Sequence, residues 1–187
     1  ISFSGQAGYR GRKVTATLFS SLYYQRSGIY YASKISDLDQ LIKRFEYGRP
    51  DPSTIHPFSY SIKPPFQQSQ HFTLKGELKW NINDNHKLTL TASFQENLRQ
   101  EFENRKKVEW SWVPMQDLIL KTYKVDAQWN AKWKLWNMST DVGTASTYQT
   151  NYNYPGTKQP AFVPNFAALT MGGYFLHRAQ FDLLQCA

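Results

Sequence analysis

The chain has 187 residues, a formal net charge of +8 and an aromatic content of 16%. So many aromatic residues exclude an intrinsically disordered chain, because disordered segments are poor in them. No run approaches the ~18 consecutive apolar residues of a transmembrane helix, which excludes a helical membrane protein. The single cysteine, Cys186, excludes an internal disulfide framework and any zinc site built on several cysteines.

The chain begins with a strand-like segment. Over residues 1–9, Ile1, Phe3 and Tyr9 alternate with small or polar residues, and a second alternation follows over 13–25. A period of two is typical of a β-strand with two different faces. The alternation is already under way at residue 1, and the last residues contain no closing turn. We therefore expect a piece of a larger protein, cut at both ends.

The clearest signal is a hairpin between residues 70 and 99. Apolar residues occupy every second position of its two arms: Phe72, Leu74, Leu78, Trp80 and Ile82, then Leu88, Leu90, Ala92 and Phe94. Between the arms lies a short polar turn at 83–86, of the kind that favours chain reversal. Two alternating runs joined by a short turn predict a β-hairpin.

Three further strand-like segments follow, and the connections alternate in length. The seven predicted strands are 1–9, 13–25, 70–82, 87–99, 117–130, 137–149 and 168–179. The short connections are 10–12, 83–86 and 131–136, and the long ones are 26–69, 100–116 and 150–167. This order predicts an all-β, antiparallel up-and-down meander. Alternating short turns and long loops are typical of outer-membrane β-barrels, so the whole of 1–187 is interpreted as a partial barrel domain.

Aromatic residues favour the same interpretation. A girdle of aromatics is expected near the short turns, where rings lie at the level of lipid headgroups: Tyr9, Trp80, Trp129, Trp133 and Trp136. A second group, including Tyr24, Phe72 and Tyr148, lies toward the long loops. The residues expected to face lipid are Leu74, Leu78, Leu88, Leu90, Phe94 and Val125.

The first long loop contains one helical pattern. Leu38, Leu41, Ile42 and Phe45 follow helical spacing, with Ser36 as the expected N-cap and Gly48 as the expected end. The candidate ligand-facing residues of the loops are the cations and aromatics Arg44, Arg49, Arg105, Trp110, Trp112 and Tyr152.

No catalytic chemistry is predicted. The sequence contains no nucleophile elbow, zinc-protease motif or phosphate-binding loop. Its four histidines lie in separate segments without ligand spacing, so no metal, cofactor or enzymatic activity is expected. The basic residues are spread over strands and loops, which argues against a nucleic-acid interface.

Several segments resemble the barrel of TonB-dependent receptors, particularly those of Bacteroidetes. The resemblance rests on the order of moderately specific motifs: the hairpin 71–80 and 87–94, the run 97–102, the loop 151–157 with 163–166, and Gly-Gly-Tyr-Phe at 172–175. It implies a 22-stranded barrel with an N-terminal plug in the outer membrane, which imports a siderophore, haem, cobalamin or glycan when TonB contacts it. The implied partners are outer-membrane lipid, the TonB complex through a segment absent here, a small nutrient ligand and a surface lipoprotein.

Two alternatives stay open at this point. The chain could be a complete small outer-membrane barrel, although seven strands is an odd number and single-chain bacterial barrels have even counts. It could also be a soluble β-sandwich that binds carbohydrate, with Trp110 and Trp112 as stacking platforms.

Overall fold

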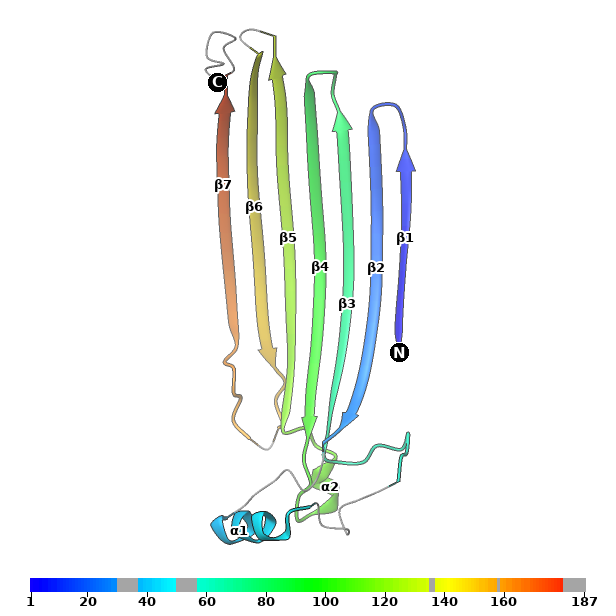
Figure 1. Cartoon of the computed structure of the whole chain (residues 1–187), viewed down its shortest axis with the longest axis vertical. Helices are drawn as coiled ribbons and strands as arrows, with labels where there is room; N and C mark the ends of the chain where they lie inside the picture. Colours follow the sequence, from blue (N-terminus) through cyan, green and yellow to red (C-terminus); the bar gives the residue numbers. More distant parts are fainter. Residues whose placement is uncertain (30–36, 50–56, 135–136, 158, 180–187) are drawn as a thin grey trace.

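The structure, a computed structural model, describes residues 1–29, 37–49, 57–134, 137–157 and 159–179. In these residues the chain forms one antiparallel sheet of seven strands, each paired with the next along the chain (Figure 1). The strands are β1 (Ser2–Arg10), β2 (Val14–Gly28), β3 (Phe66–Asn81), β4 (His86–Phe102), β5 (Gln116–Trp133), β6 (Met138–Asn153) and β7 (Phe166–Arg178). The predicted all-β up-and-down meander is therefore confirmed.

Several strands continue further toward the long loops than the sequence pattern indicates. β3 starts at Phe66, β4 ends at Phe102 and β6 ends at Asn153, three to four residues beyond the predicted bounds. In this region polar side chains lie on both faces, so the alternation is lost although the backbone pairing continues. Gln68 and Gln100 support that pairing by a hydrogen bond between their side-chain amides, at 2.8 Å.

The short turns lie together at one end of the sheet. The Gly11 amide donates to the Val14 carbonyl at 2.7 Å and closes the first turn. In the second, Asn83 Oδ1 accepts the backbone N–H groups of Asn85 and His86, both at 2.9 Å. Residues 135–136 of the third turn, and with them the predicted girdle residue Trp136, lie outside the described residues.

Two short helices lie beyond the opposite, long-loop end of the strands (Figure 1). The predicted helix is α1 (Leu38–Tyr47), which ends at Gly48 with a left-handed φ of 64°. The prediction of Ser36 as its N-cap is wrong: Asp37 caps the helix by accepting the Gln40 N–H at 2.8 Å. The second helix, α2 (Val108–Ser111), was not predicted, because four residues are too few to establish a helical period.

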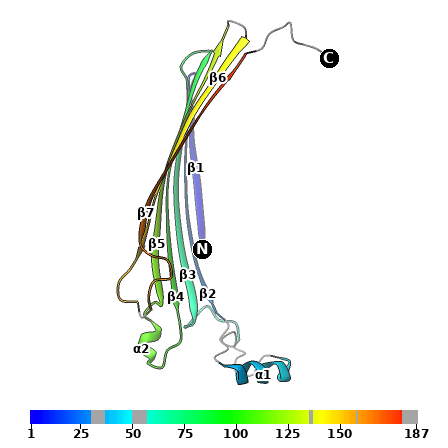
Figure 2. The ribbon, with the colours of Figure 1, turned by 90° about the vertical axis from the view of Figure 1, so that its left-hand side faces the viewer.

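The described sheet is a single twisted layer, and neither helix covers one of its faces (Figure 2). Phe66 and Ala131 are the buried apolar residues among those described. Large apolar side chains such as Val125 and Met171 are instead 55% and 70% exposed. A soluble domain buries such a face against a second layer. No helix in the described part of the chain is long and apolar enough to cross a membrane.

The strand ends are staggered in a regular way. Gly5 of β1 and Tyr123 of β5 belong to one row of paired residues. From that row β1 continues five residues to Arg10, whereas β5 continues ten residues to Trp133. An offset of five residues over four strand spacings means that the strands are tilted by roughly 40° from the perpendicular to the line that joins their ends. Outer-membrane barrel strands are tilted by about 35–45°.

Candidate functional site

The pairing register gives the sheet two chemically different faces. Paired residues lie on the same face, and successive residues of a strand lie on opposite faces. One face, here called the apolar face, carries all six residues predicted to face lipid: Leu74, Leu78, Leu88, Leu90, Phe94 and Val125. The opposite face, called the polar face, carries their sequence neighbours, such as Thr91 and Lys124.

A row of aromatic rings crosses the apolar face on the side of the long loops. Phe72, Phe94, Tyr123 and Tyr148 come from four successive strands, and neighbouring ring centroids lie 5.0 to 6.2 Å apart. These distances are within the range in which aromatic pairs attract one another. With Tyr24 of β2, these residues form what we call the loop-side belt.

A second aromatic row lies on the same face near the short turns. His86 stacks on Trp129 with a centroid distance of 5.6 Å, and Trp133 meets both rings edge-on. The Trp133 indole N–H also donates to Thr140 Oγ1 at 2.9 Å. We call these residues, with Tyr9 and Trp80, the turn-side belt. The four described residues of the predicted girdle therefore share one face and one end of the sheet.

The strip of the apolar face between the belts is the apolar band. Tyr123 and Trp133 mark its two sides on β5 and are ten residues apart, so at the tilt derived above the two belts are roughly 25 Å apart, measured perpendicular to the line of the strand ends. No charged residue lies in the described part of this band. The first charges are Glu96 and Lys121, which follow the loop-side belt and pair with each other at 3.5 Å.

The polar face carries charges at the depth of the apolar band. Lys79 pairs with Glu77 at 2.6 Å, and Lys124 pairs with Asp126 at 3.2 Å. Thr91 lies directly between Glu77 and Asp126 in the register. A row of lysines and carboxylates at this depth requires water or a polar partner on this side of the sheet.

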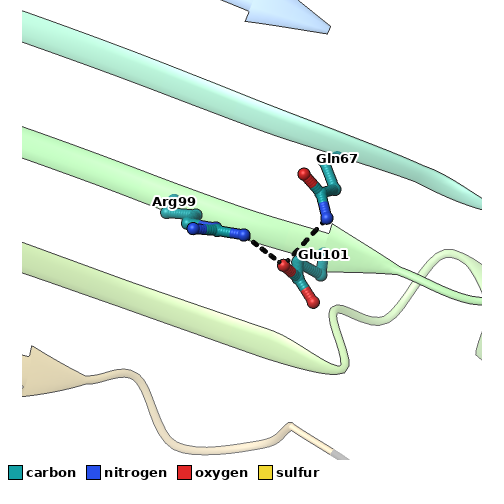
Figure 3. A network of polar contacts seen from close by, with 3 residues as sticks. All are labelled: Gln67, Arg99 and Glu101. Atoms are coloured by element: carbon teal, nitrogen blue, oxygen red, sulfur yellow. Dashed lines mark hydrogen bonds and ion pairs between the residues drawn. The ribbon is translucent and has the colours of Figure 1, made fainter. Parts of the chain in front are cut away.

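Toward the long loops the polar face changes character. Gln67 Nε2 and Arg99 Nη2 both donate to Glu101 Oε1, at 3.1 and 2.7 Å (Figure 3). Nearby, the Asn97 amide donates to His71 Nδ1 at 3.3 Å, which leaves the Nε2 proton to donate to a threonine hydroxyl. We call this end of the polar face the amide zone. Its polar side chains include Gln25, Gln67, Ser69, Gln95, Asn97, Gln149 and Asn151.

Of the predicted ligand-facing residues, Trp112 joins an aromatic cluster. Phe66 stacks on Phe102 at 4.3 Å, and Trp112 lies against Phe66 at 6.1 Å. The Arg26 guanidinium lies 4.7 Å from the centre of the Phe66 ring. This cluster anchors the loop between β4 and β5 to the end of the sheet.

The other predicted loop residues lie apart from one another. Arg44 lies in α1. Arg49 follows the capping Gly48, and its guanidinium lies 5.4 Å from the centre of the Tyr47 ring. Trp110 lies in α2 with the Lys107 ammonium 4.7 Å above its ring. The Arg105 backbone N–H donates to Ser111 Oγ at 2.9 Å, which fixes the loop that leads into α2.

The assignment of Tyr152 to a loop is wrong. It lies within β6 because that strand continues to Asn153, and the register puts it on the apolar face opposite Ile119. Its ring meets Tyr154 edge-on at 5.3 Å. Tyr152 therefore extends the aromatic surface of the apolar face beyond the loop-side belt and does not lie on the polar face.

Sequence reasoning missed the Gln67–Arg99–Glu101 contact and the His71–Asn97 contact. Each joins two strands, so only the register brings their members together, and a single sequence contains no signal for it. Among the described residues no three potential ligands lie close enough to hold a metal ion.

Comparison with known proteins adds no relative. The chain matches no protein-family model, and no curated protein matches it either.

Proposed function

We propose that this chain forms a section of the wall of an outer-membrane β-barrel of the TonB-dependent receptor type. In this role the apolar face contacts lipid, the polar face lines the lumen, and the long-loop end contacts a scarce nutrient that is imported by a TonB-driven movement of a plug. The chain performs no covalent chemistry.

One observation carries the proposal: an apolar band free of charge and bounded by two aromatic belts on one face, with charges at the same depth on the other. Lipid outside and water inside a barrel require this distribution. The strands support the same assignment. β3 to β6 are 16 to 18 residues long, whereas strands of soluble proteins usually have 3 to 10 residues.

The edges of the sheet also favour a larger assembly. β1 and β7 are the edge strands, and in the described sheet neither pairs with a second neighbour. Unpaired backbone groups in lipid cost several kcal/mol each, so a spanning sheet needs further strands to close. Barrels of about 22 strands have a lumen wide enough to hold a plug. Seven strands would then be roughly a third of the wall.

Two neighbouring substitutions test the proposal. In the full-length protein, Leu90→Arg puts a cation between Leu78 and Ala127 in the apolar band and should cost ~2–4 kcal/mol of folding free energy. Thr91→Arg puts the same cation between Glu77 and Asp126 and should be tolerated. The measurement is the amount of folded protein in outer-membrane fractions of a Gram-negative host. Equal recovery of both variants, or a wild-type protein found in the soluble fraction, would defeat the proposal.

A further inference from the structure

Positive charge is concentrated at the end of the sheet that carries the short turns (Figure 1). The described residues of the three turns, with the two strand residues on either side of each turn, are here called the basic rim. The rim contains one carboxylate, Asp84, and six cations: Arg10, Arg12, Lys13, Lys87, Lys132 and Lys134. Six cations and one carboxylate leave a net charge of +5, whereas the whole chain has +8.

The opposite end of the sheet is nearly balanced in charge. The described parts of the three long loops, which connect β2 to β3, β4 to β5 and β6 to β7, carry seven cations and five carboxylates. They include more than twice as many residues as the basic rim. The two ends of the strands therefore present different charge to their surroundings.

The cations of the basic rim are available to a partner. All six are exposed, and none forms an ion pair with a described residue. The backbone of the turns is largely satisfied internally, since Gly11 donates to the Val14 carbonyl and Lys132 donates to the Asn85 carbonyl, at 2.7 and 2.8 Å. The rim thus offers long, flexible side chains that end in ammonium or guanidinium groups.

The spread of these cations fits an extended anionic surface. The first turn joins β1 to β2 and the third joins β5 to β6, so four strand spacings, or roughly 20 Å, separate them. A compact anion would contact one turn, whereas a layer of anionic groups can contact all three. Charges act over about 10 Å at 0.1 M salt. Cations on the polar side of this single-layer sheet, such as Arg10 and Lys87, therefore also attract such a layer.

The basic rim directly adjoins the turn-side belt. Arg10 follows Tyr9, and Lys132 and Lys134 flank Trp133. Aromatic rings of this kind lie at the level of lipid headgroups, and long basic side chains beside them reach the phosphates. Clustered lysines and arginines at this level attract anionic lipids.

We infer that the basic rim binds anionic phospholipid headgroups, with phosphatidylglycerol as the representative headgroup, in the leaflet next to the short turns. This inference rests on the proposed function, because it takes the apolar face as the surface that contacts lipid.

Electron paramagnetic resonance of spin-labelled lipids tests the inference. The purified full-length protein is reconstituted in phosphatidylcholine vesicles with a trace of spin-labelled phosphatidylglycerol or spin-labelled phosphatidylcholine. The fraction of label whose motion is restricted by the protein gives the relative association constant of the two lipids. We expect an about two- to fivefold preference for phosphatidylglycerol at low salt. About 0.5 M NaCl should remove most of this preference, because salt screens charge.

A triple variant removes one cation from each turn. Lys13→Gln, Lys87→Gln and Lys134→Gln together should reduce the preference by about half or more, because three of the six rim cations are lost. The low-salt spectra of the variant and the parent protein measure the difference.

A matched control removes three exposed lysines from the long loops. Lys43→Gln, Lys63→Gln and Lys106→Gln together change the net charge equally and should leave the preference unchanged. Equal association of the two lipids, or an equal loss in both triple variants, would overturn the inference. The inference would also fail if the protein showed no lipid preference but bound fluorescent poly-glutamate through the rim lysines, since the rim would then suit a soluble acidic partner.

The same spectra report separately on the proposed function. A missing restricted fraction for both lipids would mean that the sheet does not contact lipid, which would contradict the proposed function. A restricted fraction of the same size for both lipids would overturn the inference alone.

Discussion

The two faces of β3, β4 and β5 carry opposite chemistry at the same depth. Leu90 lies between Leu78 and Ala127, whereas the next residue, Thr91, lies between Glu77 and Asp126. A step of one residue therefore moves a side chain from an apolar surface to a charged one. Burial alone does not define the faces here, since most residues of both faces are only half-buried. The distribution of charge and of aromatic rings defines them.

On the apolar face, the cost of introducing a cation should depend strongly on its depth. Leu90→Arg and Leu98→Arg make the same change on the same face of β4, but Leu98 lies beyond the loop-side belt, past Glu96. A cation costs ~2–4 kcal/mol at the bilayer midplane and ~0–1 kcal/mol near the interface. We expect the free energy of unfolding in lipid vesicles, measured by urea titration, to fall by ~1–4 kcal/mol more for Leu90→Arg than for Leu98→Arg. Equal losses would contradict a depth-dependent lipid contact.

A smaller effect is expected in the turn-side belt. Trp129→Ala removes the ring that stacks on His86 and meets Trp133 edge-on, and should cost about 1–2 kcal/mol through these ring contacts. Trp129→Phe keeps a ring and should recover most of that loss. The same vesicle titration measures both. A Trp129→Ala variant as stable as the parent protein would show that the belt contributes nothing to anchoring.

The smallest effect compares two ion pairs, one on each face. Glu96→Gln leaves Lys121 without its partner at the edge of the apolar band and should cost about 1 kcal/mol, at the upper end for exposed pairs. Glu77→Gln leaves Lys79 on the polar face, where water solvates it, and should cost less than about 0.5 kcal/mol. Double-mutant cycles with Lys121→Met and Lys79→Met measure both couplings. The reverse order would indicate that the assignment of the two faces is inverted.

Much of the fold could be predicted from the sequence because alternation is a local signal. The hairpin formed by β3 and β4 follows directly from residues such as Leu74 and Leu88 on one parity and lysines on the other. The alternation ends where both faces of the sheet carry polar residues. Around Gln68 and Gln100 polar residues occupy both parities, so the predicted strands stop early although the sheet continues. The same holds around Tyr152, where polar residues occupy both parities, so the sequence indicates a loop although β6 continues to Asn153.

The candidate site could be predicted only in part, because it depends on contacts between strands. Cations and tryptophans such as Arg105 and Trp112 stand out in a loop, and the sequence indicates that they are candidates. The contact of Gln67 with Glu101 joins residues 34 positions apart. Its partners are ordinary polar residues when read along the chain. Only the register, which the sequence does not specify by itself, makes them neighbours.

A label scan along β4 distinguishes an apolar face that contacts lipid from one that is covered by protein. Single cysteines are introduced in turn from position 88 to 93 of the full-length protein, in a background in which Cys186 and every other native cysteine are replaced by serine, and are nitroxide-labelled in vesicles. We predict that accessibility to oxygen is high at 88, 90 and 92 and that accessibility to a water-soluble nickel complex is high at 89, 91 and 93. Low oxygen accessibility at the even positions would mean that protein covers this face, and an absence of alternation would mean that the strand lies elsewhere. Either result would contradict the lipid-facing assignment.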